Sequence, residues 1–385
     1  MKHNFFKFGL MTALVAVTLN LTSCKDNNEG EFDDENAATV AAQFVDHTVV
    51  PTYTKLAEKT ELLVEQLKTL KANPTNANVQ AVCATFLEAR SWWEKSEAFL
   101  FGAAGDFGID PHIDSWPLDV NAFNTLMNSP AMIAALDGED GDEVAGNNLG
   151  NALLGFHGIE YILFADGQPK PASSLSENDL IYAVAVAGDL RNRCYQLEVS
   201  WAGDKAPANH IAKLNELELP YTVASGDLSY GENMKKAGNS GSTYSSRIVA
   251  LMAIVDGCKT IADEVGTSKI GAPHTGEDVN YIESPYSQKS IVDFYDNIIS
   301  IQNAYMGGIE GQRDESKSLH KFVKDNDADL DARVVAAIEN ALAKINAMPT
   351  PFVNNYTSAA CGDAMEACAA VDALFSEVNE MLRKL

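Results

Sequence analysis

The chain has 385 residues, of which 54 are acidic and 28 are basic, so its formal net charge is -26 at neutral pH. This excess of negative charge repels phosphate backbones and anionic lipid surfaces, which argues against nucleic acid as a partner. It is compatible with a cationic ligand, and equally with a solvated surface that keeps the chain in solution.

The first 24 residues resemble an export signal. A short basic leader, MKHNFFK, precedes the apolar run FGLMTALVAVTLNL, which is too short to span a bilayer comfortably. The run ends in Leu21-Thr22-Ser23-Cys24, which resembles the bacterial lipoprotein cleavage box. We therefore expect Cys24 to be lipidated and to become the first residue of the mature protein, with a plain secretory signal as the alternative.

Residues 25–36 are polar and acidic, and they bury too little apolar surface to fold. We expect them to form a flexible tether. The whole pattern predicts a cell-envelope lipoprotein, anchored by its lipid in the outer membrane or alternatively the inner one. It leaves open whether the protein faces the periplasm or the cell surface.

From residue 37 onward, apolar residues recur at intervals of three and four, which predicts an all-α protein. The predicted helices span residues 37–48, 51–72, 76–101, 146–165, 176–202, 207–217, 243–266, 287–306, 328–347 and 357–384.

A segment rich in Gly, Ser and Asn, 225–246, is expected to be a linker or a surface loop. It divides the chain into an N-terminal helical bundle, 37–224, and a C-terminal one, 247–385, both of ordinary domain size. Two short similar stretches, which follow Trp93 and Ser300, suggest an ancient duplication.

The cysteines beyond Cys24 form no CxxC pattern, which argues against a zinc ribbon or a disulfide scaffold. We expect most of them to be small buried hydrophobic residues, and their disulfide status stays open. They are Cys83, Cys194, Cys258, Cys361 and Cys368.

His157 and Glu160 lie three residues apart in an otherwise apolar helix. At this spacing both side chains leave the same face of the helix and can share one partner. A carboxylate buried alone and ionised is very unfavourable, so Glu160 must be paired, protonated or ligated. A metal cation is one such partner, and a buried arginine is another.

The predicted helix 76–101 offers a complementary polar stripe. Arg90, Glu94 and Glu97 fall on one face, and paired carboxylates that face a His and a Glu are how helical bundles build metal sites. The loop 105–117 adds Asp110 and Asp114 as candidate oxygen ligands, and His112 as a further one.

The same residues allow an explanation without metal. Arg90 can pair with Glu94 or Glu97 along its helix, and His157 can bond to Glu160 or to a backbone carbonyl. The spacing alone does not decide between the two.

The sequence resembles the imelysin family. The family's hallmark GxHxxE is present as Gly155-Phe156-His157-Gly158-Ile159-Glu160. Further similar blocks follow in family order, at residues 49–53, 93–102, 113–117, 283–290 and 296–308.

This resemblance implies a two-domain helical fold with the GxHxxE helix near the domain junction, and an association with iron uptake. It also implies a metal site at His157 and Glu160, with Glu94, Glu97 and Asp114 as partners. The family is filed among metallopeptidases as well, and Glu160 would then be the catalytic residue.

A zinc peptidase needs three protein ligands, an open position and a general base. The helix supplies one imidazole and one carboxylate, and oxygen ligands favour iron over zinc. We therefore expect a metal-binding protein of iron uptake, with a metal ion or an iron-bearing ligand and an envelope transport protein as partners. Zinc is the alternative metal, and a metallopeptidase is the alternative function.

A third possibility is a lipoprotein that binds a protein or a small ligand in a cleft between the domains. The residues expected to line that pocket are Trp93, Asp110, His112, Trp116, Gly155, Ser287, Ser290, Asn297 and Arg313.

Overall fold

The computed structural model describes residues 34–385. The predicted signal, the predicted lipidation site Cys24 and most of the predicted tether therefore lie outside the described residues. The tether's last three residues already belong to the first helix, which begins at Asp34. The described chain is almost entirely helical, and this confirms the predicted all-α class.

The long helices are close to those predicted. They are α1 (Asp34–Phe44), α2 (Val50–Ala72), α3 (Asn76–Glu94), α10 (Glu177–Ala202), α13 (Arg247–Glu264), α15 (Ser290–Met306), α17 (Ala328–Asn346) and α19 (Ala359–Leu382).

Shorter helices connect them. They are α4 (Ala103–Asp106), α5 (Ile109–Ile113), α6 (Val120–Met127), α7 (Pro130–Leu136), α8 (Gly141–Asn148), α9 (Gly155–Leu163), α11 (Ala208–Glu216), α12 (Tyr230–Lys235), α14 (Gly271–Thr275), α16 (Leu319–Asn326) and α18 (Phe352–Asn355). The two strands β1 (Phe164–Ala165) and β2 (Gln168–Pro169) pair antiparallel, with Phe164 opposite Pro169.

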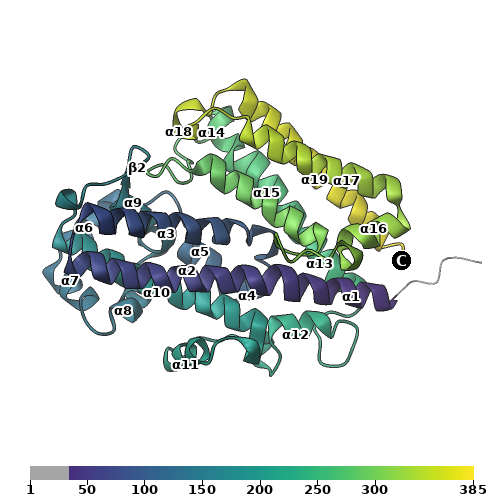
Figure 1. Cartoon of the computed structure of the whole chain (residues 1–385), viewed down its shortest axis with the longest axis horizontal. Helices are drawn as coiled ribbons and strands as arrows, with labels where there is room; N and C mark the ends of the chain where they lie inside the picture. Colours follow the sequence, from purple (N-terminus) through teal and green to yellow (C-terminus); the bar gives the residue numbers. More distant parts are fainter. Residues whose placement is uncertain (1–33) are drawn as a thin grey trace, which may run out of the picture. The chain divides into compact units, whose positions relative to one another are not determined.

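The first two predicted helices are in fact one. A π-helical turn, η1 (Val45–Val49), joins α1 to α2 without a break, and Figure 1 shows the two in line. Pro51 cannot donate a hydrogen bond to the carbonyl of His47 one turn earlier. The N–H of Ile309 fills that place, 2.9 Å from the His47 oxygen. The helix therefore continues through the proline, and a loop of the second half is fixed to it.

Two of the predicted helices are too long. The helix that carries Arg90 ends at Glu94 rather than at residue 101, because Ser96 bonds back to the Trp93 carbonyl and Ser300 accepts the N–H of Ala98. Glu97 consequently lies on a separate 3-10 turn, η2 (Glu97–Phe99). The predicted helix 146–165 begins only at Gly155, the first residue of α9.

Gly155 explains where α9 begins. Its φ is +66°, a conformation that glycine adopts readily and other residues do not. A Cβ atom at this position would lie 1.8 Å from the carbonyl oxygen of Ile113. The glycine therefore lets α9 pack directly on the C-terminal end of α5.

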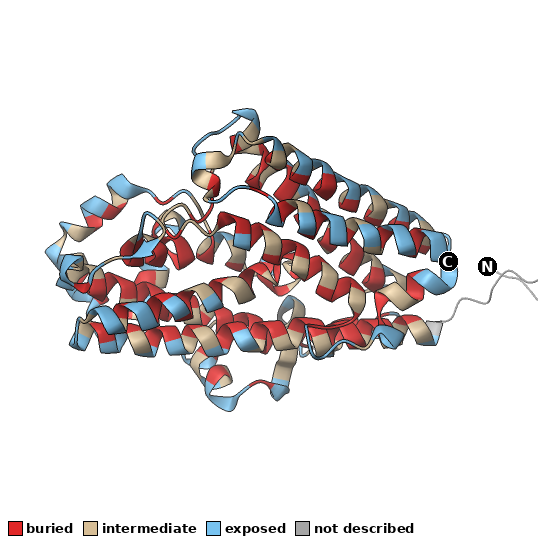
Figure 2. Cartoon of the chain, turned by 45° about the horizontal axis from the view of Figure 1, so that its top comes forward, coloured by how far each residue is buried: buried red, intermediate tan, exposed pale blue. Residues whose placement is uncertain are grey.

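The long helices form two packed groups. In the first, α2 lies between α3 and α10; in the second, α19 packs against α13 and α17. The groups meet where α15 contacts α3 and where α13 contacts α1. Figure 2 shows buried residues along the helices of both groups.

Part of the segment predicted as a linker, 225–246, is ordered and packed. It contains α12, whose Tyr230 and Met234 are buried and which contacts α10 and α1. The predicted duplication is not confirmed, and the division into two domains at this segment stays a prediction.

The five cysteines beyond Cys24 are all buried, and no disulfide joins any of them in the described chain. Between residues 34 and 385, no helix has the length and apolarity that crossing a membrane requires.

Candidate metal centre

A cluster of buried charged side chains lies where the two groups of helices meet. Segments far apart in the sequence contribute to it: α3, the residue after α5, α9, the π-helical turn η7 (Val265–Lys269), the loop before α15, and α15 itself. Every member is at least nine-tenths buried. The members are Arg90, Glu94, Asp114, His157, Glu160, Lys269, Glu283 and Asp293.

Arg90 is the centre of the cluster. Its Nη2 lies 2.6 Å from Glu94 Oε1 and 2.5 Å from Glu283 Oε1, and its Nη1 pairs with Asp114. The second cation, Lys269, places its Nζ 3.1 Å from Glu283 Oε1 and 3.8 Å from Glu94 Oε2. Because buried charges must be paired, these two cations hold the carboxylates in place.

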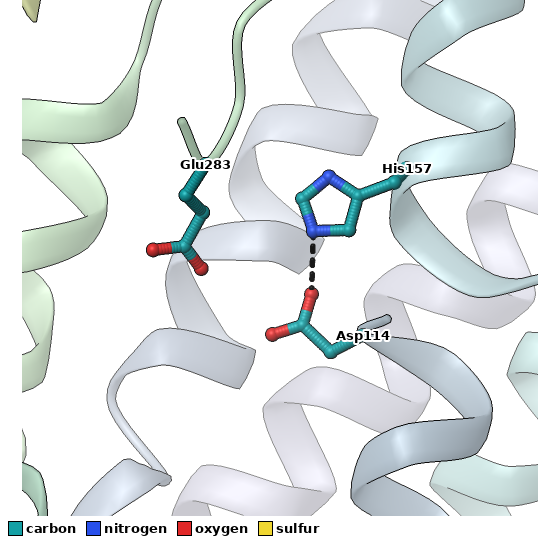
Figure 3. Close-up of side chains that lie close together, drawn as sticks. All are labelled: Asp114, His157 and Glu283. Atoms are coloured by element: carbon teal, nitrogen blue, oxygen red, sulfur yellow. Dashed lines mark ion pairs between the residues drawn. The ribbon is translucent and has the colours of Figure 1, made fainter. Parts of the chain in front are cut away.

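His157 lies between two carboxylates, Asp114 and Glu160, and Figure 3 shows its contact with Asp114. Its Nε2 is 3.0 Å from Asp114 Oδ1, and its Nδ1 is 3.5 Å from Glu160 Oε2. Glu160 is itself held by the backbone N–H of Ser287, at 2.7 Å. Asp114 accepts a further hydrogen bond of 2.7 Å from the indole N–H of Trp93. The imidazole therefore has a fixed orientation, with Nε2 directed toward Asp114 and Glu283.

The loop that carries Glu283 is shaped by serines. Ser284 has a φ of +47°, and its hydroxyl donates to Asp293. Ser290, the first residue of α15, donates from its hydroxyl to the Glu283 carbonyl oxygen at 2.5 Å. These contacts turn the loop so that the Glu283 carboxylate faces His157 and Asp114.

The cluster contains more carboxylates than cations, and this shifts the pKa values of its members. Burial raises the pKa of Glu94 well above its usual range, against the opposing effect of Arg90. Burial also raises the pKa of Asp293, to about 8. Asp114 is the exception: burial opposes its ionisation, but Arg90 and His157 hold its pKa well below the usual range.

The pKa of His157 is raised from 6.5 to about 9, because Asp114 and Glu160 outweigh the opposing effect of burial. The stability that a protonated His157 contributes is fully present below pH 6.5 and is lost as the pH rises through 9. The metal-free protein should thus lose up to about 3 kcal/mol of unfolding free energy across this window. Urea unfolding at a series of pH values measures it, and a His157→Gln variant with the same pH dependence would contradict the assignment.

Three groups of ligand atoms lie close enough to hold a metal ion, with all atoms of a group within 4.8 Å of one another. The groups, found among the described residues, are Asp114–His157–Glu283, Glu94–Glu97–Asp114 and Glu94–Glu283–Asp293. Glu160 belongs to none of these groups. Its contacts place it on the Nδ1 side of the imidazole, where it orients His157.

Several buried polar atoms of the cluster make no hydrogen bond. Those that also lie outside every ion pair are Oε2 of Glu283, the hydroxyl of Ser287 and Oδ1 of Asn297. Native structures leave few buried polar atoms without a partner, so such a concentration points to a bound ion or water.

A small cavity of about 220 Å³ borders the cluster. It reaches the cluster at Asp114 and Lys269 and is lined further by Glu97, Asp110, Pro111, Ser115, Trp116, Glu264 and Tyr281. A neighbouring cavity of about 490 Å³ shares Glu97, Asp110 and Glu264 with it. The otherwise buried cluster can therefore be approached from this side.

The structure brings most of the predicted site residues together. Besides the charged residues, Asn297 donates to Glu94 Oε2 at 2.5 Å, and the Trp116 ring lies 5.6 Å from the imidazole of His157. The contacts of the metal-free explanation, Arg90 with Glu94 and His157 with Glu160, are present too. They are therefore compatible with either role of the cluster.

Two predicted residues make their contacts elsewhere. His112 pairs with Asp189 of α10, at 2.8 Å. Arg313 bonds to Gln302, Asn303 and the Gly308 carbonyl at the C-terminal end of α15.

Three members of the cluster were given no role in the predicted site: Lys269, Glu283 and Asp293. Glu283 begins a block, ESPYSQKS, that already stood out by its resemblance, so that block was the available signal. The sequence around Lys269 and Asp293 shows only the pattern of an ordinary helix end and gives no signal of a site.

The fold and the site define an all-helical protein with a buried histidine–carboxylate cluster between two groups of helices. The chain belongs to the imelysin family, because a model of that family, described as Imelysin, matches residues 49–381.

Iron-regulated protein A of Synechococcus elongatus is 28% identical over 318 residues, which cover 82% of this chain and 77% of that protein. The crystal structure described as an iron-regulated protein A precursor from Parabacteroides distasonis matches with a TM-score of 0.76 and 28% identity, over 91% of this chain and 95% of that one. An imelysin-like protein from Psychrobacter arcticum shares the fold, with a TM-score of 0.62 and 15% identity, over 89% and 94% of the two chains.

Proposed function

We propose that this protein binds a metal ion, preferably iron, through Asp114, His157 and Glu283. We also propose that it takes part in iron uptake. One observation carries the proposal: these three side chains, buried and from three separate segments, place their ligand atoms within 4.8 Å of one another. The names of the two iron-regulated relatives support iron as the metal.

The donor set fits such an ion. An imidazole nitrogen and carboxylate oxygens suit iron and manganese, and zinc less specifically. Two ligands that each lie about 2.1 Å from a metal at a right angle are about 3.0 Å apart. His157 Nε2 and Asp114 Oδ1 are separated by 3.0 Å.

Arg90 and Lys269 hold the same carboxylates that would bind the metal. A metal ion therefore competes with two protein cations, as well as with the proton on His157. This competition favours a site that takes up and releases its ion over one that retains it permanently.

A metallopeptidase is less well supported. Its general base would be Glu160, but the Glu160 carboxylate is tied to the backbone of Ser287 and lies behind the imidazole of His157. It does not line the cavity that borders Asp114. A base in that position has no route to a substrate peptide.

The role in the cell envelope rests on the sequence alone. Lipidated Cys24 would anchor the protein in a membrane, and a transport protein of the envelope would receive the metal. An export-competent Cys24→Ala variant that stayed in the membrane fraction would contradict the anchor.

His157→Ala is expected to lower the affinity for Fe(II) at least about 100-fold, because it removes the only nitrogen ligand of the proposed set. Anaerobic titration of the metal-stripped protein with Fe(II), Fe(III) and Zn(II) measures this change. The control is His112→Ala, which removes a histidine that pairs with Asp189 outside the cluster. Equal Fe(II) affinities for the two variants would contradict the proposed site.

A further inference from the structure

The small cavity beside the cluster has a strongly negative lining. Four carboxylates and one ammonium group line it, which gives a formal charge of -3 when all are ionised. Two of these groups, Asp114 and Lys269, are already engaged in the buried cluster. The other three carboxylates, Glu97, Asp110 and Glu264, line both this cavity and its larger neighbour.

Within residues 34–385, the side chains of these three carboxylates make no hydrogen bond or close ion pair, and Lys269 is the one cation of the cavity lining that attracts them. Glu97 is the clearest case, because it is only 7% exposed and yet makes neither a hydrogen bond nor an ion pair. The side chains of Asp110 and Glu264 also make none. Lys269 already pairs with Glu283, so it compensates these carboxylates only in part, and the cavity favours additional positive charge.

The spacing of the carboxylates excludes direct binding of one bare ion by all three. Within residues 34–385, neither Asp110 nor Glu264 belongs to a group of ligand atoms close enough to coordinate a metal. An ion that keeps its shell of water contacts carboxylates through those waters, and the carboxylates can then lie further apart. Magnesium and similar ions are commonly bound in this way.

The size of the cavity agrees with a hydrated ion. Six water molecules take up about 180 Å³, at roughly 30 Å³ each. The cavity measures about 220 Å³. Pockets for organic ligands of drug size usually begin at about 300 Å³, so this cavity taken alone is smaller than one for an iron chelate.

We propose that Glu97, Asp110 and Glu264 form an entry site that holds a hydrated metal cation through its water molecules, beside the buried cluster. This inference rests on the proposed function, and it specifies the form of the substrate: the metal reaches the cluster as an aqua ion and not within an organic chelate. Asp114, which lines the cavity and belongs to the cluster, joins the two sites.

Hexaamminecobalt(III) is a suitable probe, because its six ammine ligands do not exchange and it can only bind through its outer shell. The metal-stripped protein should bind one equivalent in a calorimetric titration. The double variant D110N/E264Q should bind it roughly tenfold or more weakly, since two of the attracting carboxylates are gone. D263N is the matched control, because Asp263 is an exposed neighbour of Glu264 outside this cavity.

Equal binding by D110N/E264Q and D263N, or no binding by the wild type, would overturn the entry site. The single variant E264Q, with a partly exposed side chain, should show an intermediate loss and guards against misfolding of the double variant. The probe cannot report on the buried site, because its ammine ligands do not exchange and His157 does not line the cavity. An error in the proposed buried metal site would thus be seen only in the Fe(II) titration. An error in the proposed entry site would be seen only in the titration with the cobalt probe.

Discussion

Arg90→Met is expected to lower the free energy of unfolding by about 3–5 kcal/mol. The guanidinium of Arg90 neutralises Asp114, Glu94 and Glu283, none of which reaches solvent. Methionine fills much of the same space but leaves these carboxylates without their main counterion. Lys269 alone cannot replace it, because Asp114 is not among its ion-pair partners.

Guanidinium unfolding of Arg90→Met beside the wild type measures this loss. Arg333→Met is the matched control, since Arg333 pairs with Asp329 and Glu377 at the surface, where ion pairs contribute little. The deficit of Arg90→Met should shrink on acidification, because Asp114, left without the arginine that lowers its pKa, can then be protonated. A midpoint unchanged from the wild type would show that the cluster does not depend on this arginine.

Gly155→Ala is expected to lower the free energy of unfolding by about 3 kcal/mol. The left-handed backbone conformation contributes about 1–2 kcal/mol of this loss, and overpacking contributes about 1–3 kcal/mol. The added Cβ would meet the Ile113 carbonyl oxygen at 1.8 Å, so one of the two backbones must move. Ile113 directly precedes Asp114, and Gly155 lies two residues before His157. The shift should therefore also separate Asp114 from His157 and weaken Fe(II) binding.

Two other glycines separate these contributions. Gly108 has a φ of +60° but nothing within 4 Å of an added Cβ, so Gly108→Ala measures the conformational part alone. Gly150 has a φ of -74° and equally open space, so Gly150→Ala should be nearly neutral. In thermal unfolding, Gly155→Ala should have the lowest midpoint temperature of the three variants by a clear margin. Equal effects of Gly108→Ala and Gly155→Ala would mean that the contact with Ile113 relaxes without loss.

The long helices could be predicted because their apolar period is local and sustained, as in α2 and α10. The short helices between residues 103 and 148 could not, since segments of four to eight residues carry too few turns to show a period. The end of α3 was missed for another reason: Ser300, in a distant part of the chain, accepts the Ala98 N–H that a longer helix would have used.

The candidate site likewise combines contacts within one helix, which the sequence indicates, with contacts between distant segments, which it does not indicate. The pairs Arg90–Glu94 and His157–Glu160 follow from helical spacing, so the sequence alone indicates them. Glu283 lies 193 residues from Arg90, and no periodicity connects the two. The tight packing of Gly155 on Ile113, which brings Asp114 to His157, is likewise a property of the assembled fold.

The buried cysteines have a consequence for the chemistry of iron. Peroxide, which accompanies redox-active iron in aerated solution, oxidises thiolates far faster than thiols. Burial raises the pKa of Cys83 and of Cys368 to about 12, and it raises those of Cys194, Cys258 and Cys361 as well. All five therefore stay protonated and shielded, so we expect the folded protein to resist the formation of mixed disulfides and sulfenic acids if it binds iron as proposed.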